Sequence, residues 1–501
     1  MTLGVPPTGA PPYGFRFAHG FATASRPSRR LTHNVIKRYN NFKKNCRFAV
    51  EQKNDHMDTL LSANLLYKST FFFLNSIILD LKNEKKFIMG QRAFKNSCFF
   101  SLTSLVYLLL SPLKCSLQLE IYRFFKKQSK MPSKSAFVQA RRKISYRLFK
   151  ELHSKWVDEY ALTDCSERYK GYQLVGVDGT TIYLPQTEGC RRVFGSIKNQ
   201  HGSQSYSRCC LMVDLLAGYC LAGKMGRCYA SELNQFRSIM DKLPKNSISV
   251  FDRLYAGTNL FFELIHNNHK FIIRCKTSFN NTLKAFIKED IEVKDVEMPL
   301  SERAITQLKS QGYQVNSKTR IKVRLVRVLL PNKKYEYLIT NVLDSNFTID
   351  DYREIYNLRW GVETAIDTLK NKLRLEHFSG HLPSTIRQDF YASLMKYNFA
   401  IKIYNEAQKN LNHQEHKKNN LNQNEKPKRK INKNMAVNLT GDLIRNYDVP
   451  EKELIEQIKV VLEVLVRFPE PVRPNRTETR KTSLNKARGR CWYNTNFKYS
   501  S

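Results

Sequence analysis

Three acidic and two basic residues in this chain have the types and spacing that phosphoryl transfer requires. Asp178 and Asp252 each follow a short apolar run, and Glu363 lies in a segment that can form a helix. Carboxylate oxygens are hard ligands that suit magnesium, and two magnesium ions can activate a hydroxyl group and stabilise the departing oxygen of an in-line displacement. Arg359 and Lys370 supply positive charge for a phosphate. These residues predict a site for metal and phosphate.

One helix has to present several of these side chains together. The segment 356–370 has one glycine and no proline. At 100° per residue, Tyr356, Arg359, Glu363 and Lys370 fall on a stripe roughly 60° wide and about 21 Å long. The apolar residues of the segment fall on an adjoining face, so the stripe lies at the margin of a buried face. The alternative interpretation is an ordinary amphipathic helix with a salt-bridged margin.

Two buried strands have to bring the aspartates to the same place. We expect one strand from residue 174 that carries Asp178 at its carboxyl end, and another from residue 248 that ends in Asp252. Between them, residues 208–216 and 219–225 predict a strand pair, and residues 231–243 predict a helix. Together these elements predict an α/β fold with a mixed sheet of ribonuclease-H-like type.

The rest of the chain is expected to surround this core. Residues 134–143 predict a helix with a basic face, and residues 348–351 predict a cap for the helix that carries Glu363. We divide the chain as follows: 1–56, a disordered or non-native extension; 57–165, a helical N-terminal DNA-binding region; 166–267, the first part of the core; 268–346, an all-β insertion; 347–407, the second part of the core; 408–434, a basic linker; 435–501, C-terminal helices and a basic tail.

Composition points to a polyanionic partner. The chain has 501 residues and a formal net charge of +39, which favours nucleic acid, because the basic residues are not gathered into one membrane-binding cluster. Eleven cysteines without a C-x-x-C pair indicate free thiols in a reducing cytoplasm, not a zinc ribbon or a disulfide framework. The apolar runs at 71–81 and 98–110 are shorter than the ~20 residues of a membrane span, so we expect core helices there.

The spacing Tyr356-x2-Arg359-x3-Glu363-x6-Lys370 resembles the Y-R-E-K signature of the IS-four family of insertion-sequence DDE transposases. Asp178 and Asp252 resemble that family's first and second acidic residues. The resemblance covers about residues 130–405. It implies a ribonuclease-H-like catalytic core, interrupted by a β insertion, that cuts DNA at transposon ends and joins the ends to a target.

The resemblance also implies roles for residues and partners. Asp178, Asp252 and Glu363 would be catalytic and would bind two Mg²⁺ ions, which Mn²⁺ could replace. Double-stranded DNA, as transposon ends and target, would be held by basic and aromatic side chains, and a homodimer would assemble on it in the prokaryotic cytoplasm, at the nucleoid. The candidates for DNA contact are Tyr356, Arg359, Lys370, Arg253, Arg374, Arg141, Arg142 and Lys143.

Two positions depart from the family pattern. The family often has glycine two residues after the second aspartate, where this chain has Leu254, so the turn can be shared only if φ is negative there. Members that form a hairpin intermediate use an insertion-domain tryptophan to hold a flipped base, whereas this chain has Trp156, Trp360 and Trp492, none of them in the insertion. The strand-cleavage pathway is therefore left open.

Other interpretations remain beside these. Asp367 lies near the stripe and is a rival third acid. His377 and His381 have metal-ligand spacing, although a surface or core pair is the simpler interpretation. The adjacent Cys209 and Cys210 are expected to pack in a strand. At the level of function, the alternatives are a catalytically inactive protein that binds inverted repeats and a structure-selective nuclease of the same fold.

Overall fold

The computed structural model describes residues 55–90, 93–94, 99–111, 115–126, 131–161, 167–199, 202–330, 333–419 and 428–472. The chain divides after Asn54, and the fold described here is that of the second part, Asp55–Ser501, within the residues given above. The predicted extension at 1–56 and the basic tail after residue 472 therefore lie almost wholly outside the described residues.

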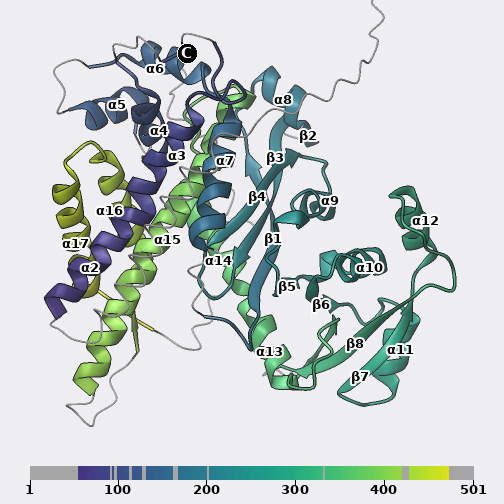
Figure 1. Ribbon diagram of the computed structural model, residues 1–501. Helices are drawn as coiled ribbons and strands as arrows, with labels where there is room; N and C mark the ends of the chain where they lie inside the picture. Colours follow the sequence, from purple (N-terminus) through teal and green to yellow (C-terminus); the bar gives the residue numbers. More distant parts are fainter. Residues whose placement is uncertain are drawn as a thin grey trace, which may run out of the picture. The chain divides into compact units, whose positions relative to one another are not determined.

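The part of the chain before the sheet is helical, as predicted (Figure 1). Its helices are α2 Asp55–Tyr67, α3 Phe73–Leu81, α4 Leu102–Leu110, α5 Leu117–Phe125, α6 Lys134–Arg142 and α7 Tyr146–Trp156. The two apolar runs fall on α3 and α4, and all residues of α4 except Thr103 are buried, as expected for a core helix. Within the described residues, no helix is long and apolar enough to cross a membrane.

Within the described residues, nine strands form one sheet in the order β2-β3-β1-β5-β6-β9-β8-β7, with β4 paired to β3. The strands are β1 Gln173–Tyr183, β2 Ser196–Asn199, β3 Gly202–Asp214, β4 Cys220–Arg227, β5 Ser247–Phe251, β6 Lys270–Cys275, β7 Val293–Pro299, β8 Arg320–Leu329 and β9 Tyr335–Thr340. β1 and β6 are parallel to β5, whereas β3 is antiparallel to both β1 and β4. This arrangement confirms the predicted ribonuclease-H-like mixed sheet.

The register of β1 and β5 brings Asp178 and Asp252 side by side. Val177 lies opposite Phe251 in the parallel pair, and the next residue on each strand is an aspartate. β5 ends there, as predicted, but β1 continues to Tyr183 because residues 178–183 still pair with β3. Asp178 therefore lies in mid-strand and not at the carboxyl end of its strand, which corrects the sequence prediction.

The segment between β6 and β9 differs from the all-β insertion that its alternating pattern predicts. β7 and β8 alternate with two helices, α11 Asn281–Lys288 and α12 Glu302–Ser310. Each helix begins at a side-chain cap, Asn280 for α11 and Ser301 for α12. Such short helices show little more than two turns of periodicity, so the neighbouring strands dominate the pattern. β9 pairs with β6, and the inserted strands therefore prolong the core sheet.

The helix predicted to carry Glu363 is present in two parts. α13 Ile349–Leu358 and α14 Trp360–Asp367 meet at Arg359, whose backbone stays helical but bonds three residues back. The predicted cap is a complete capping box, in which Thr348 and Asp351 each accept the backbone N–H of the other. α14 then passes into a π-helical turn at residues 368–372. The charged stripe is thus shared by two helices that join at its arginine.

α13 and α14 lie on the face of the sheet that carries the aspartates. Ile355 of α13 belongs to the same buried cluster as Leu174 of β1 and Ile248 of β5. Because side chains alternate along a strand, Asp178 and Asp252 share this face with Leu174 and Ile248. The packing of α13 therefore brings the charged stripe to the aspartates.

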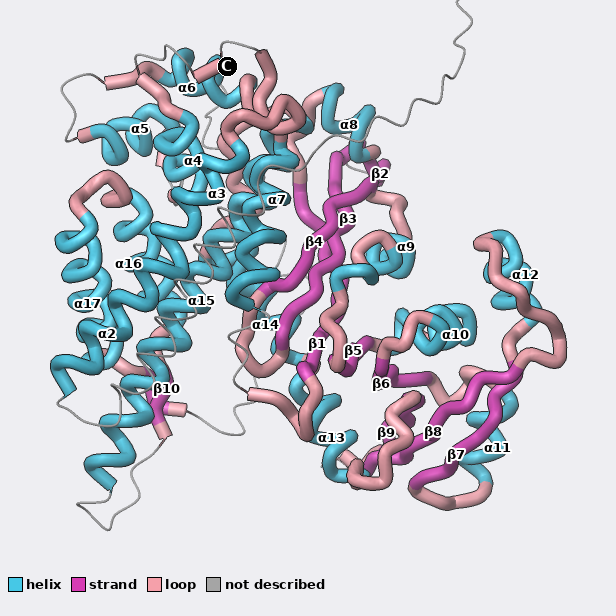
Figure 2. Tube along the Cα trace, in the orientation of Figure 1, coloured by secondary structure: helices cyan, strands magenta, loops and turns pink. Residues whose placement is uncertain are grey.

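Further helices lie around the sheet and beside it (Figure 2). They are α8 Glu188–Phe194, α9 Glu232–Arg237, α10 Thr258–His266, α15 Pro383–Asn419, α16 Lys433–Arg445 and α17 Glu451–Arg467. α15 contacts α7, β4, α16 and α17. It continues past residue 407, so the first part of the predicted linker is helical, because its polar residues include neither glycine nor proline. Beyond residues 420–427, which lie outside the described residues, β10 Arg429–Lys430 pairs with β11 Glu470–Pro471.

Candidate active site

The two aspartates lie half-buried where β5 ends. Asp178 accepts a hydrogen bond from the backbone N–H of Gly179, with 2.8 Å between nitrogen and Oδ1. Asp252 is extended and begins a short 3-10 turn at Arg253–Tyr255. Leu254, where the family often has glycine, is 74% exposed and does not have a positive φ. The turn after Asp252 therefore accommodates leucine without strain.

Glu363 lies on the face of the sheet that carries the aspartates because α14 packs closely on β1. A Cβ atom on Gly176 would lie 3.2 Å from Cβ of Val362, the residue before Glu363. Val362 and Ala365 are buried, while the side chain of Glu363 is 36% exposed. Glycine on β1 thus admits the helix, and the helix holds Glu363 at the edge of the buried face.

Arg359 is the cation at the centre of these acids. Its Nη2 atom lies 2.7 Å from Oε1 of Glu363, and the residue is only 8% exposed. Burial lowers the pKa of the guanidinium, but the hydrogen bond to Glu363 and the charges of Glu363 and Asp252 raise it above its ordinary value overall. Arg359 also acts on Asp178, whose pKa its charge lowers. One buried cation therefore interacts with all three acids.

Asp178 is the acid whose ionisation is most opposed by its surroundings. Burial raises its pKa to about 6, and the charges of Glu232 and Glu363 add to the increase, while the Gly179 N–H and Arg359 act against it. Perturbation of this kind is common at functional sites. Burial is thus the main reason that the charged form of Asp178 is disfavoured.

Two buried polar atoms beside the acids have no hydrogen-bond partner within the described residues. They are the hydroxyl oxygen of Tyr356 and Nε of Arg359, on residues that are 7% and 8% exposed. Burial raises the pKa of Tyr356 to about 12, so its hydroxyl remains a donor. Buried donors without partners are uncommon and costly, and two of them near the same acid, Asp252, suit an anion with several oxygens.

Lys370 lies against β1 beyond Asp178. Its Nζ atom donates to the carbonyl oxygen of Thr181 at 2.7 Å and is 3.3 Å from Oε1 of Glu376. Its side chain is 25% exposed. Lys370 therefore lies beside the strand that carries Asp178. Its ammonium group already has partners in Thr181 and Glu376.

The donor chemistry fits a hard divalent cation, but the arrangement does not yet form a cage for one. Three carboxylates with little compensating charge suit magnesium or manganese. Within the described residues, however, no group of three or more histidine, cysteine or acidic side chains is placed to hold a metal ion. Glu363 is turned to Arg359 instead.

The other predicted DNA-contact residues are spread over the molecule. Arg253 follows Asp252 directly and is exposed, as is Arg374, which has a left-handed backbone with φ of 52°. Arg142 and Lys143 are also exposed but lie at the end of α6, which Figure 1 separates from β5 and α14. Only the first two are close to the candidate site along the chain.

Arg141 is not available to DNA, which corrects its prediction as a contact residue. It is 2% exposed, and its Nη2 atom lies 2.6 Å from Oδ1 of Asp389. It also donates to Gln388, Ser379 and the carbonyl oxygen of Thr385. The side chain thus fixes α6 to the start of α15, a role that a basic pattern on α6 alone does not reveal.

The rival ligands stay apart from the acids. Asp367 is exposed and accepts a hydrogen bond from Asn371. His377 and His381 belong to no group that could hold a metal within the described residues. Cys209 and Cys210 are fully buried in β3, as predicted.

Sequence reasoning missed one acid beside the site. Glu232, at the start of α9, packs on β1 so closely that a Cβ atom on Gly179 would lie 2.2 Å from its carboxylate carbon. Its Oε1 atom is 2.6 Å from Nη1 of Arg208. The glycine after Asp178 was the available signal, because a glycine in a strand often marks a close approach.

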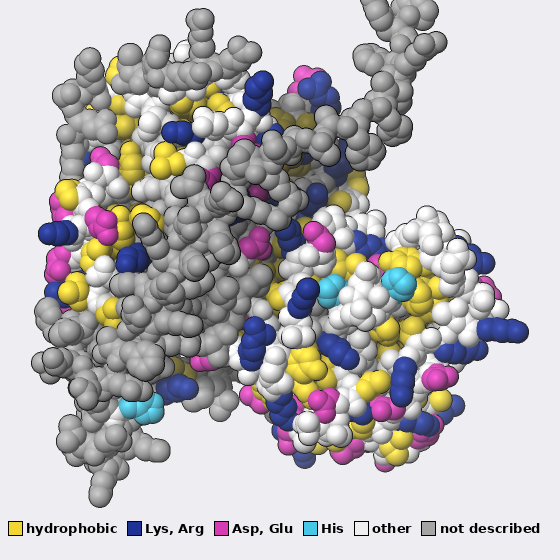
Figure 3. Space-filling model, in the orientation of Figure 1, with side chains coloured by type: hydrophobic (Ala, Val, Ile, Leu, Met, Phe, Trp, Pro, Cys, Tyr) yellow, Lys and Arg dark blue, Asp and Glu magenta, His cyan; other side chains and the backbone are white. Residues whose placement is uncertain are grey.

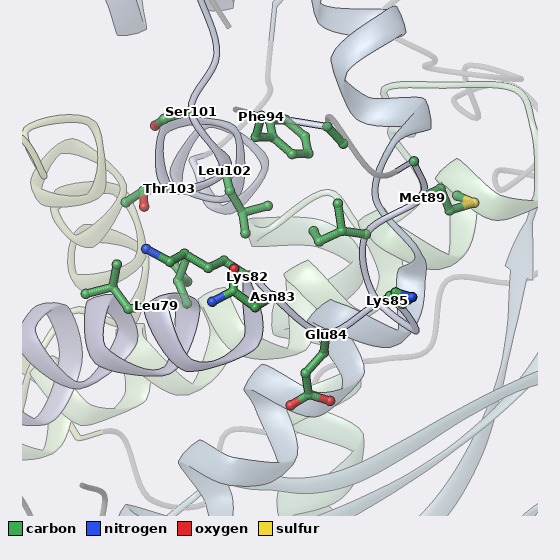
Figure 4. A pocket seen from close by; sticks show the side chains of 14 residues that line it. Leu79, Lys82, Asn83, Glu84, Lys85, Met89, Phe94, Ser101, Leu102 and Thr103 are labelled. Atoms are coloured by element: carbon green, nitrogen blue, oxygen red, sulfur yellow. The ribbon is translucent and has the colours of Figure 1, made fainter. Parts of the chain in front are cut away.

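One cavity and many of the basic surface residues lie away from the candidate site. Lys and Arg side chains are scattered with acidic ones over the part built from β6 to β9 (Figure 3). A cavity of about 940 Å³ opens between the end of α3 and the start of α4, lined by Leu79, Lys82 and Leu102 among others (Figure 4). None of the predicted site residues lines it.

Comparison with known proteins finds a family match for one part of the chain. Residues 169–399 match the family model described as the transposase DDE domain, which supports a DDE transposase family for the segment that carries all three acids. No curated protein matches the chain. Among solved structures, the chain is similar to piggyBac transposase in a cryo-EM synaptic complex with hairpin DNA. The identity is 12%, the shares covered are 87% of this chain and 90% of that chain, and the TM-score is 0.37.

Proposed function

We propose that this chain is a DNA transposase of the IS-four type, which cleaves DNA at the ends of an insertion sequence and joins those ends to a target. The observation that carries the proposal is the strand register that puts Asp178 and Asp252 at neighbouring positions, under the helix that carries Glu363 and near two donors without partners among the described residues. The transposase DDE match over residues 169–399 supports the same chemistry.

The acids and the donors have separate roles in this proposal. Asp178, Asp252 and Glu363 would hold Mg²⁺, or Mn²⁺ in its place, which would activate a water or a 3′-hydroxyl and stabilise the leaving oxygen. Tyr356 and Arg359 would donate hydrogen bonds to a phosphate of the transposon end. The donors position the strand, so that the scissile phosphate faces the acids.

Other parts of the chain would bind the remaining DNA. The net charge of +39 suits a long polyanion, and exposed Arg253 and Arg374 flank the site along the chain. Arg142 and Lys143, on the helical part, would contact the terminal inverted repeats. We propose a homodimer on DNA, acting at the nucleoid of a prokaryotic cell.

A cleavage assay tests the function. The purified chain is incubated with Mg²⁺ and labelled duplex DNA that carries the inverted repeats flanking its coding region. We expect nicks that leave 3′-hydroxyl groups at the repeat ends, followed by strand-transfer products. A duplex with the repeats scrambled serves as the matched control and should stay intact.

The same assay separates the alternatives. Sequence-specific binding without any nick would indicate an inactive inverted-repeat binder and contradict the proposal. Cutting of both duplexes at equal rates, without joining, would indicate a nuclease.

A further inference from the structure

Arg359 supplies positive charge beside the three acids. It forms a 2.7 Å ion pair with Glu363, and its charge also acts on Asp178 and Asp252. A guanidinium cannot lose its proton in a protein, so this charge is permanent. As long as the pair persists, Glu363 is not free to complete a cation site, in agreement with the lack of a metal-holding group among the described residues.

The pair is favoured because the guanidinium of Arg359 is buried and Glu363 is its hydrogen-bonded counter-charge. The side chain of Arg359 is 10% exposed and that of Glu363 is 36% exposed. Removing one member of a buried pair is strongly unfavourable. A metal that took Glu363 would deprive the buried guanidinium of its hydrogen-bonded partner, and a phosphate that took Arg359 would leave the acids without their shared cation.

Both exchanges together leave no charge unpaired. The Nε atom of Arg359 and the hydroxyl of Tyr356 have no partner within the described residues, so an arriving phosphate finds donors ready to bind it. When Arg359 turns from Glu363 to that phosphate, the carboxylate is released toward Asp178 and Asp252. The two ligands therefore favour each other's binding.

We infer that Arg359 is a switch that couples DNA binding to metal binding: its ion pair with Glu363 keeps the metal site incomplete until a DNA phosphate takes the guanidinium. This inference rests on the proposed function, because it takes the polyanion to be DNA. It assigns to Arg359 a restraint on metal binding in addition to its contact with the strand.

Metal binding without turnover tests the switch. Mn²⁺ binding to the full chain is measured by electron paramagnetic resonance of free Mn²⁺ at constant ionic strength, on ice. The variant Arg359→Gln removes the pair, and Arg353→Gln is the matched control, because it removes an exposed i,i+3 pair with Asp350 on α13. Without DNA, we expect Arg359→Gln to bind Mn²⁺ about tenfold more tightly than the wild type, and Arg353→Gln to match the wild type.

The wild type supplies an independent measurement if the variant does not fold. A duplex copied from the flanking repeats, with its own Mn²⁺ binding subtracted, should tighten Mn²⁺ binding to the wild type about tenfold, and by reciprocity Mn²⁺ should tighten DNA binding by the same factor. The duplex should change binding to Arg359→Gln much less.

Equal Mn²⁺ affinity of the wild type with and without DNA overturns the inference, as does equal affinity of the DNA-free wild type and Arg359→Gln. If the wild type nevertheless nicks the repeat ends in Mg²⁺, the proposed function stands and only the switch fails. If Arg359→Gln shows the expected gain but no DNA is cut, the ion pair restrains a metal site whose function is different.

Discussion

At the residue scale, Asp178 carries a charge that its surroundings disfavour. Its pKa in the folded chain is about 6, above that of an ordinary aspartate, so the folded state holds a proton that the unfolded chain has released. Stability is therefore lost as pH rises through the interval between about 4 and 6. Asp178→Asn removes this charge while keeping the side-chain shape and the oxygen that accepts from Gly179.

We expect Asp178→Asn to raise the free energy of unfolding by roughly 1–3 kcal/mol near pH 8 and to change it little near pH 4. Thermal unfolding followed by circular dichroism at the two pH values checks this. A gain of equal size at both would show that burial of the charge is not the cause.

Substitutions of Arg141 and of its neighbour Arg142 test the contribution of the buried ion pair between Arg141 and Asp389. Arg141→Met should destabilise the fold by about 3–5 kcal/mol, because it leaves the Asp389 carboxylate buried without its cation. Arg142→Met, on an exposed residue, should change stability by less than about 0.5 kcal/mol. Urea unfolding of both variants measures the difference, and similar losses would contradict the structural role of Arg141.

At the element scale, the start of α13 controls the position of the charged stripe. The capping box between Thr348 and Asp351 fixes this end, and Asp351 also pairs with Lys170 just before β1. Thr348→Ala should cost about 0.5–2 kcal/mol of stability. Ser301→Ala removes the cap of α12, which carries no candidate site residue.

We expect the two cap variants to lose similar stability, but only Thr348→Ala to slow nicking, because α13 carries Tyr356. Urea unfolding and the rate of nicking at the repeat ends are measured for both. Equal slowing in both variants would mean that loss of stability, and not the position of α13, limits the rate.

The elements themselves were largely predictable, whereas their junctions were not. Apolar runs before Asp178 and Asp252 predict buried strands, and those strands exist. The continuation of β1 past Asp178 depends on pairing with β3, which is a contact distant in sequence. The break at Arg359 was not predicted either, although Gly361 two residues later weakens the helical pattern there.

At the scale of the whole molecule, the net charge indicates the kind of partner, and the strand order determines where the site residues meet. The net charge of +39 predicts a polyanionic partner but cannot place it. The fixed spacing of Tyr356, Arg359 and Glu363 predicts one face of a helix, and the strand order then brings that face to the aspartates. Local pattern could not show that Arg141 is buried or that Glu232 packs beside Asp178, because both depend on contacts between distant segments.

The nicking rate of Glu363→Gln at the repeat ends tests the account most directly. The substitution keeps the size of the side chain and removes the carboxylate that we propose to be required for cleavage. We predict that the wild type nicks the repeat ends in Mg²⁺, and that Glu363→Gln binds the same DNA within about twofold but nicks it slower by a factor on the order of 10³ or more. Nicking by Glu363→Gln at the wild-type rate would contradict the assignment of the active site.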